Sequence, residues 1–400
     1  MKDKKLSLPK PSRLRTHWAL APRTVFLNHG SFGACSKPIL KLQTRFRQQM
    51  EAEPVQFLWR HYDEHLDVAR KALARFLGAR PRDLVFVNNA TTAINAVARS
   101  YPLRPGDEVL TTSHDYNACR NVLREVVRRA GASLVVARMP FPVSSPAEVV
   151  DAVMRSVTRR TRLAMIDHVT SDTALVYPIE QLVRKLEQHG IDVLVDGAHA
   201  PGMVPLNISK LCPAFYTGNL HKWVCAPKGA AFLWVREERQ GEIQPAVVSH
   251  GNNRSRPGHT PFQDRFDWAG TVDPSPWFCV AETLLWMDGL LPEGWPEVRR
   301  RNRDLAIQAR RLLCRELSIE PPCPESMLGS MATLPLPESF QTVPRNGKID
   351  REQLQLYDRY KIEVPFSRFG EPERRWFRIS AQLHNTLADY QYLADCLRRL

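Results

Sequence analysis

Short apolar runs alternate with stretches of helical periodicity along the middle of the chain. Seven runs have the length of buried strands: 84–87, 108–111, 133–136, 163–166, 191–195, 215–216 and 230–235. Stretches between them, such as 91–99 and 179–189, carry apolar residues at helical spacing. This alternation predicts an α/β fold in which a mostly parallel seven-stranded sheet is covered by helices on both faces.

The pattern differs on either side of this region. Residues 1–25 are rich in proline and basic residues and predict an extended arm, and a long helical pattern runs from Pro38 to Gly78. After about Pro274 we expect long helices at 277–290 and 295–317, strands at 331–334, 362–364 and 376–379, and a closing helix from Thr386. We therefore divide the chain into an N-terminal arm (1–25), a large domain (26–275) and a smaller C-terminal α+β domain (276–400).

Composition indicates in which cellular compartment the protein is expected. No stretch approaches the ~18 consecutive apolar residues of a membrane span. The basic segment 1–15 has no apolar core, so we expect no secretory signal, and Asp3 disfavours a transit peptide. The eight cysteines are scattered without a C-x-x-C pair, which indicates neither a metal site nor a disulfide framework. We expect a cytoplasmic protein with reduced thiols and no membrane association.

The formal net charge of +14 raises the question of nucleic-acid binding. The basic residues are spread over many segments, and no nucleic-acid-binding motif accompanies them. An anionic cofactor and substrate account for the charge at least as well. We therefore expect a small-molecule partner and no nucleic acid.

Polar residues follow several of the predicted strands, and ligands of α/β sheets bind beyond the carboxyl ends of strands. Thr91 and Thr92 open a predicted helix, where backbone N–H groups and hydroxyls suit a phosphate, although a plain helix cap is the alternative. Asp196 ends an apolar strand, and its carboxylate could pair with a protonated pyridine nitrogen. A helix cap or surface turn is the alternative for Asp196.

Four further residues have a chemical and a structural interpretation. Lys222 follows a strand between Tyr216 and Trp223, surroundings that favour the neutral amine needed for imine formation, whereas most lysines are solvated. His199 could hydrogen-bond a ring hydroxyl or be structural. Tyr116 could stack on a cofactor or belong to the core or surface. Arg378, inside an apolar strand, would bind a substrate carboxylate or form a structural salt bridge.

The ordered set of motifs resembles the class V aminotransferase family of fold-type I enzymes that depend on pyridoxal phosphate (PLP). The branch that includes isopenicillin N epimerase is the most similar. The matching segments are Leu-Asn-His-Gly-Ser-Phe-Gly at 27–33, Asn-Ala-Thr-Thr at 89–92, His-Asp-Tyr at 114–116, 195–202 around Asp196, 217–223 around Lys222, Gly-Thr at 270–271 and Arg-Ile-Ser at 378–380. They run in family order over nearly the whole chain.

The resemblance implies roles around the cofactor ring and the substrate. Lys222 would hold PLP as an imine, Asp196 would pair with the pyridine nitrogen, His199 would lie near the ring hydroxyl, and Tyr116 would stack on the ring. Arg378 would hold the substrate α-carboxylate. Two further residues would lie near the substrate entrance: Asn28 and His29.

The resemblance also implies a phosphate site and a homodimer. Four residues would surround the phosphate: Thr91, Thr92, Asn219 and His221. Thr271 would reach the phosphate of the neighbouring subunit. The chain departs from the family at Ala174, where similar proteins often carry glycine. Cys323 lies in the region of the nucleophilic cysteine of desulfurases, but its flanking prolines favour a structural residue.

The reaction is the least determined feature. A substrate amine would displace Lys222, which would then act as the base at Cα. Reprotonation on the opposite face gives an epimerase, which the resemblance favours, but no second proton donor is evident. Loss of a β-substituent gives a C–S lyase, which needs only one base. Transamination and a non-catalytic protein of the same fold are the remaining alternatives.

Overall fold

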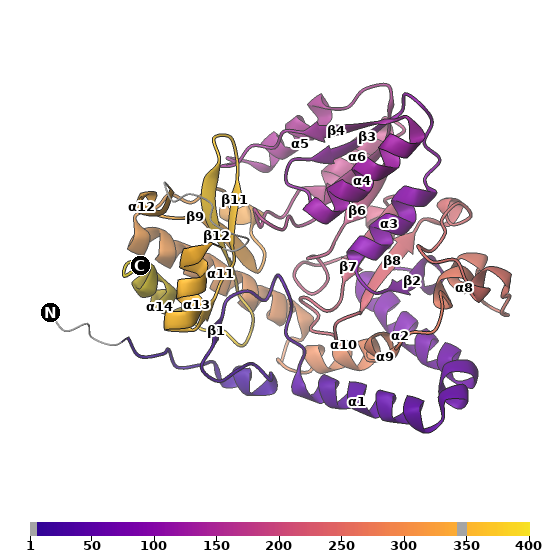
Figure 1. Cartoon of the computed structure of the whole chain (residues 1–400), viewed down its shortest axis with the longest axis horizontal. Coiled ribbons are helices and arrows are strands. Elements are labelled where there is room, and N and C mark those ends of the chain that lie inside the picture. The colour runs from indigo at the N-terminus through magenta and orange to yellow at the C-terminus, as the bar shows by residue number, and fades with distance from the viewer. Residues whose placement is uncertain (1–5, 342–349) are drawn as a thin grey trace.

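The structure, a computed structural model, describes residues 6–341 and 350–400. The first five residues of the expected arm lie outside this part. The largest sheet has the seven strands that the sequence predicts, in the order β2-β8-β7-β6-β5-β3-β4 (Figure 1). Their bounds are β2 (Leu84–Val87), β3 (Glu108–Thr112), β4 (Ser133–Ala137), β5 (Thr161–Asp167), β6 (Asp192–Asp196), β7 (Phe215–Asn219) and β8 (Ala231–Val235). Only β8 is antiparallel to its neighbours, so the mostly parallel sheet is confirmed.

Helices cover both faces of this sheet, and most of its strands are therefore buried along their whole length. One apolar cluster joins the sheet to α3 (Ala90–Ser100), α4 (Asn117–Ala130) and α8 (Pro261–Asp267). The other joins it to α2 (Tyr62–Leu77), α5 (Pro146–Arg155) and α6 (Ile179–Gln188). Gly78 ends α2 in the left-handed conformation (φ 59°), where glycine is favoured.

The C-terminal part combines helices with a three-stranded antiparallel sheet of order β11-β12-β9. Its strands are β9 (Met331–Pro335), β11 (Phe366–Phe369) and β12 (Arg374–Ser380). The helices after the large sheet are α9 (Ser275–Phe278), α10 (Val280–Asp288), α11 (Trp295–Leu317), α12 (Glu338–Gln341), α13 (Arg351–Tyr360) and α14 (Leu387–Leu397). An α+β arrangement is therefore present, as expected from the changed sequence pattern.

Several elements differ from the sequence expectation. The single helix expected at 277–290 is divided into α9 and α10 around Cys279, which keeps a near-helical conformation (φ −73°, ψ −10°). Helices α5 and α13 and strand β11 were not predicted. In α5, the adjacent Val149 and Val150 lower helix propensity because their branched side chains are restricted against the preceding turn.

The N-terminal segment is tied to the C-terminal part. Strand β1 (Val25–Phe26) pairs in parallel with β10 (Ile362–Glu363), and the N–H of Ser380 donates to the carbonyl of Leu27 at 2.9 Å. The glycine turn at 28–33 therefore lies between the large sheet and β12. We propose the domain boundaries expected from the sequence, after residues 25 and 275. Strand β1 spans the first of these boundaries. The remaining helices are α1 (Lys37–Ala52) and the short α7 (Ile208–Leu211).

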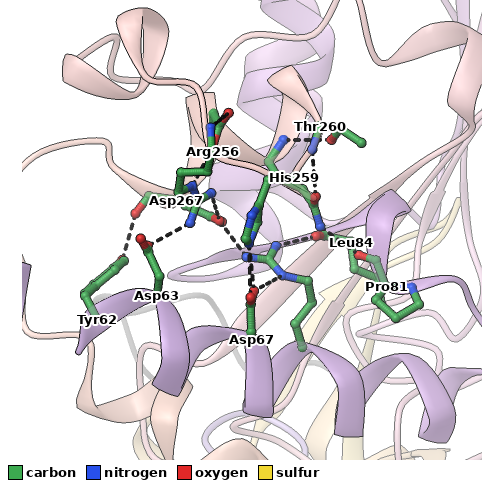
Figure 2. Close-up of polar contacts among 12 residues, drawn as sticks. Tyr62, Asp63, Asp67, Pro81, Leu84, Arg256, His259, Thr260 and Asp267 are labelled. Atoms are coloured by element: carbon green, nitrogen blue, oxygen red, sulfur yellow. Dashed lines mark hydrogen bonds and ion pairs between the residues drawn. The ribbon is translucent and has the colours of Figure 1, made fainter. Parts of the chain in front are cut away.

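A buried ionic network anchors the segment around α8 to α2 (Figure 2). Arg256 donates to Asp63, Asp264 and Asp267 at 2.6–2.7 Å, and Arg70 donates to Asp267 at 2.6 Å. Breaking a buried, hydrogen-bonded pair is costly because it leaves an uncompensated charge. The network therefore fixes the start of the loop that carries residues 270–271.

No helix in residues 6–341 and 350–400 is long and apolar enough to cross a membrane. The same residues contain no group of three or more His, Cys, Asp or Glu side chains placed to hold a metal ion.

Candidate active site

A cavity of about 420 Å³ lies beyond the carboxyl ends of β2, β5, β6 and β7. Parallel strands end at the same edge of a sheet, so residues far apart in sequence meet there. Seven of the residues predicted from the sequence line this cavity: Thr91, Tyr116, Asp196, His199, Asn219, His221 and Lys222.

Lys222 is held in the cavity by His199. The amine of Lys222 lies 3.0 Å from Nε2 of His199, and Nδ1 of His199 accepts the indole N–H of Trp223 at 3.3 Å. Because Nδ1 accepts, the neutral ring carries its proton on Nε2, which donates to the Lys222 amine when that amine is neutral. Burial, and then the charge of Arg378, lowers the pKa of Lys222 to about 8. A useful fraction of neutral amine is therefore present near neutral pH.

Asp196 presents a buried carboxylate to the same cavity. Its Oδ1 accepts the N–H of Ala198 at 2.9 Å, and its Oδ2 accepts the thiol of Cys119 at 3.5 Å. It forms no ion pair with any Lys, Arg or His in the part of the chain that the structure describes. Burial raises the pKa of Asp196. A cationic ring nitrogen beside Asp196 would supply the missing opposite charge.

A second carboxyl group, Asp167, lies beside Asp196 and was missed in the sequence. Asp167 and Asp196 are paired residues on the adjacent strands β5 and β6, and both are buried. Oδ2 of Asp167 has no hydrogen-bond partner within the described residues. Burial, and then the charge of Asp196, raises the pKa of Asp167 well above its ordinary value. The signal was available, because Asp167 ends an apolar strand as Asp196 does.

The N-terminus of α3 lies at another side of the cavity. The Asn89 side chain caps the helix by accepting the N–H of Thr92 at 2.8 Å and its hydroxyl at 3.1 Å. Thr92 lines a neighbouring cavity instead of this one, and the residue that caps the helix is Asn89 and not a threonine. Asn219 accepts the N–H of Ala90 at 2.9 Å. Thr91 is the threonine that lines the candidate site.

Two basic side chains lie near this helix terminus. Nδ1 of His221 donates to the carbonyl of Ala230 at 3.1 Å, which leaves the Nε2 lone pair for the cavity. Burial, and then the charge of Lys222, lowers the pKa of His221 to about 4, so a phosphate contact through Nε2 requires added protonation. Lys228, which the sequence did not single out, also lines the cavity and donates to the carbonyl of Gly33.

Arg378 lies just behind the cavity wall. Its guanidinium donates to the carbonyl of Ser171 at 2.7 Å and to the hydroxyl of Ser31 at 2.8 Å, and both serines line the cavity. The salt-bridge alternative is not seen, because Arg378 has no carboxylate partner in residues 6–341 and 350–400. A buried cation without such a partner suits an anionic substrate group.

Asn28 and His29 do not line the cavity. His29 is fully buried behind Lys222, where its Nε2 donates to the Lys222 carbonyl at 3.0 Å. Burial lowers the pKa of His29 to about 3. Asn28 accepts from Arg378 at 3.4 Å and donates to Glu363 at 3.3 Å. The structure therefore places these residues as supports for the lysine and arginine instead of at an entrance.

The remaining candidates lie outside the cavity or at its edge. Tyr116 is half exposed at the start of α4, and Thr271 is exposed on the loop after α8. Cys323 is buried beside Arg310, and burial raises its pKa to about 11, which suppresses the thiolate. Ala174 adopts the left-handed conformation (φ 57°), which favours glycine.

These residues fit pyridoxal phosphate. One cavity combines a lysine amine with a lowered pKa, a buried carboxylate without a cationic partner, and the N-terminus of an eleven-residue helix. These groups suit, in turn, the aldehyde, the ring nitrogen and the phosphate of that cofactor.

Known proteins are similar to this chain over most of its length. The family model for aminotransferase class-V matches residues 44–313. Isopenicillin N epimerase from Amycolatopsis lactamdurans is 34% identical, with 96% of this chain and 97% of that protein covered. A probable chloroplastic L-cysteine desulfhydrase from Arabidopsis thaliana is 30% identical, with 94% and 82% covered.

A solved structure shows the same fold at lower identity. It is a C-DES mutant with glycine covalently linked to its PLP cofactor, and it covers 98% of this chain and 99% of its own with a TM-score of 0.79 and 18% identity. The family match and the full-length relatives lead to one conclusion: the chain belongs to the class V aminotransferase family, a family of PLP-dependent enzymes.

Proposed function

We propose that the protein removes the Cα proton of an amino acid with Lys222 as the base, and that the reaction is an epimerisation. The observation that carries the proposal is the convergence of Lys222 and Asp196 on one cavity, with Arg378 unpaired beside it. Each group matches one requirement of amino-acid chemistry with PLP: a basic amine, a partner for the ring and a partner for the substrate carboxylate.

We assign the cofactor contacts to the groups around the cavity. Lys222 would hold PLP through its amine, Asp196 would keep the ring nitrogen protonated, and His199 and Tyr116 would contact the ring. The helix terminus at Thr91, with Asn219 and Lys228, would hold the phosphate. His221 would join them when protonated, and Thr92 would act through the cap of the helix.

The protein's own groups then act on the substrate. Arg378 would bind the α-carboxylate and so orient the Cα–H bond, while Asn28 and Ser31 hold the guanidinium in place. Lys222 would take the proton from Cα, since burial lowers its pKa to about 8. Bound PLP supplies an electron sink for the pair left on Cα.

Epimerisation is supported by full-length similarity to isopenicillin N epimerase. It needs a proton donor on the face opposite Lys222. A C–S lyase is the second candidate, supported by similarity to a probable L-cysteine desulfhydrase, and it needs one base only. The burial of Cys323 away from the cavity argues against Cys323 as a nucleophile in either reaction.

We further propose a cytoplasmic homodimer in which Thr271 reaches the neighbouring site. Apolar side chains are exposed near Thr271: Val247 and Val272 line one shallow cavity, and Trp59 packs edge-to-face on Trp268 at 6.3 Å. Exposed apolar groups that gather in one region are typical of interfaces. All eight cysteines are free thiols, which agrees with a reducing compartment.

The test combines a spectrum with a product assay. Purified protein with added PLP is expected to show the near-visible band of a lysine-bound cofactor, and Lys222→Ala is expected to lose it while keeping its circular dichroism. Turnover should fall by at least about 10³-fold, since the base is removed. An epimerase converts an L-amino acid to a mixture of stereoisomers without releasing pyruvate.

Each outcome decides between the candidates. Pyruvate released from cysteine or its conjugates establishes the lyase and removes the epimerase. Full activity in Lys222→Ala, or no cofactor band with the wild-type protein, contradicts the assigned site. Asp196→Ala serves as the second variant and is expected to weaken cofactor retention.

A further inference from the structure

A second cavity, of about 300 Å³, lies beside the candidate active site. The loops after β3 and β4 form one wall and the turn between β11 and β12 forms the other. The residues that matter for its chemistry are His114, Arg138, Phe141, Asp172, Phe369 and Glu371. This cavity is outside the groups assigned to the cofactor.

The second cavity begins where the substrate carboxylate is expected to bind. Ser171 lines the active-site cavity, and its neighbour Asp172 lines the second one. Likewise, Tyr116 lines the active-site cavity, and its neighbour Asp115 lines the second one. Arg378 donates to both the carbonyl and the hydroxyl of Ser171, at 2.7 and 3.2 Å. A substrate held by Arg378 therefore has the second cavity within reach of its side chain.

Aromatic rings give this cavity a fixed apolar wall. Phe141 packs against Phe369 and Trp376, with ring centroids 5.5 and 4.8 Å apart. Phe369 in turn stacks on Trp376 at 5.1 Å. Phe141 and Phe369 line the cavity from its two sides, and both pack on the buried Trp376, so this apolar surface is preformed and suits a hydrocarbon chain.

The unpaired charge of this cavity is negative. Glu371 is paired with Arg138, and Asp115 is paired with Arg120. Asp172 is exposed and forms no ion pair in the described residues, and the positive charge that acts on it is that of Arg378, which is assigned to the substrate carboxylate. The backbone carbonyl of Asp172 accepts from Thr333 at 2.7 Å. His114 adds no charge at neutral pH, because burial lowers its pKa to about 4. A cationic group is therefore the favoured occupant near Asp172.

We propose that the second cavity binds the side chain of the amino-acid substrate, and that this side chain is long, apolar along its stem and ends in an ammonium group. The stem would lie against Phe141 and Phe369, and the ammonium group would pair with Asp172. The inference rests on the proposed function and adds the substrate class to it.

The size of the cavity supports a long side chain. A volume of about 300 Å³ is at the lower end of the range for small-molecule sites. The cysteine side chain has one atom beyond Cβ and would leave most of this space to solvent. A lysine-like side chain, or a longer one, would occupy it.

The experiment measures exchange of the Cα proton with D₂O by mass spectrometry, using the PLP-loaded enzyme. The three probes are L-2-aminobutyrate, L-norleucine and L-lysine, of which the last two share a four-carbon stem and differ by the ammonium group. Exchange precedes the step that separates epimerase from lyase, so the assay does not depend on the final product.

The inference predicts the order of kcat/KM for exchange. L-Norleucine should exceed L-2-aminobutyrate, and L-lysine should exceed L-norleucine by about fivefold, the size of a partly exposed ion pair. Asp172→Asn should abolish the advantage of L-lysine over L-norleucine, mainly through KM. Phe369→Ala should lower exchange of both long substrates relative to L-2-aminobutyrate.

The matched control is Glu373→Gln, which removes a carboxylate two residues from Glu371 on the same turn but outside the cavity. It should leave all three rates unchanged. Equal kcat/KM for the three probes, or an unchanged preference for L-lysine in Asp172→Asn, overturns the inference, while exchange itself upholds the proposed removal of the Cα proton. No exchange with any probe overturns both.

Discussion

Asp167 and Asp196 place two buried carboxyl groups side by side at the ends of β5 and β6. Like charges this close in a buried site cannot both ionise without a large cost, so we infer that the pair retains a proton. Asp167 is the member with an unpartnered oxygen, while Asp196 accepts two hydrogen bonds. The proton therefore belongs on Asp167, and the charge on Asp196.

This assignment predicts how stability changes with pH in Asp167→Asn. The folded-state pKa of Asp167 is raised above its unfolded value of about 3.9, so folding is accompanied by proton uptake. The stability of the wild type therefore falls as pH rises above about 4. The decrease is about 1.4 kcal/mol per pH unit until the folded-state pKa is reached. Asp167→Asn has no carboxyl group at this position, so its stability does not show this decrease with pH. It should match the wild type near pH 3 and exceed its stability at pH 7.

Denaturant unfolding of the cofactor-free protein across pH 3–8 would measure the difference. Asp358→Asn, a substitution of the same kind at an exposed position on α13, is the control and should not widen its gap from the wild type with pH. A gap for Asp167→Asn that is constant over this range would show that Asp167 is ionised in the folded protein.

The glycine turn at 28–33 and the segment 219–223 act together as one element. His29 donates to the Lys222 carbonyl, and Lys228 donates to the Gly33 carbonyl. A Cβ atom added to Gly33 would lie 2.5 Å from the carbonyl oxygen of His221 and 2.7 Å from Cα of Lys222. These are backbone atoms, so the two segments would have to separate.

We expect Gly33→Ala to weaken PLP binding by about tenfold or more, since overpacking of this kind costs about 1–3 kcal/mol and would displace Lys222. Equilibrium dialysis with PLP measures the change. Gly241→Ala is the matched control, because a Cβ atom there meets nothing within 4 Å. Unchanged affinity in Gly33→Ala would show that the turn can shift without moving the lysine.

At the scale of the whole molecule, the ionic network of Figure 2 and the exposed apolar side chains belong to the same region. The network ties the start of the 268–273 loop to α2, and Val247, Val272 and Trp59 remain exposed around that loop. A second copy of the chain would bury these side chains and bring its Thr271 toward the cofactor phosphate.

The wild-type protein is therefore expected to be a dimer by light scattering at micromolar concentration. Val247→Asp should shift it toward monomer, because the substitution places a charge in an apolar interface. Leu354→Asp, at an exposed apolar position on α13, should remain dimeric. A monomeric wild-type protein, or a dimer unaffected by Val247→Asp, would contradict the proposed interface.

Features that depend on neighbouring residues were predictable from the sequence. Apolar runs predicted all seven strands of the large sheet, because a strand buried on both faces must be apolar throughout. Asp196 and Lys222 stood out because polar residues at strand ends break that pattern, and the ordered motifs identified the family. Both residues line the same cavity.

Contacts between distant segments were decided only by the tertiary structure. His29 and Thr92 share motifs with the candidate residues, yet one is buried behind Lys222 and the other bonds to Asn89. The second cavity depends on Arg138 meeting Glu371, 233 positions away. Strand patterns are local, whereas the orientation of a side chain and the shape of a cavity depend on which elements pack together, and that is set by the whole core.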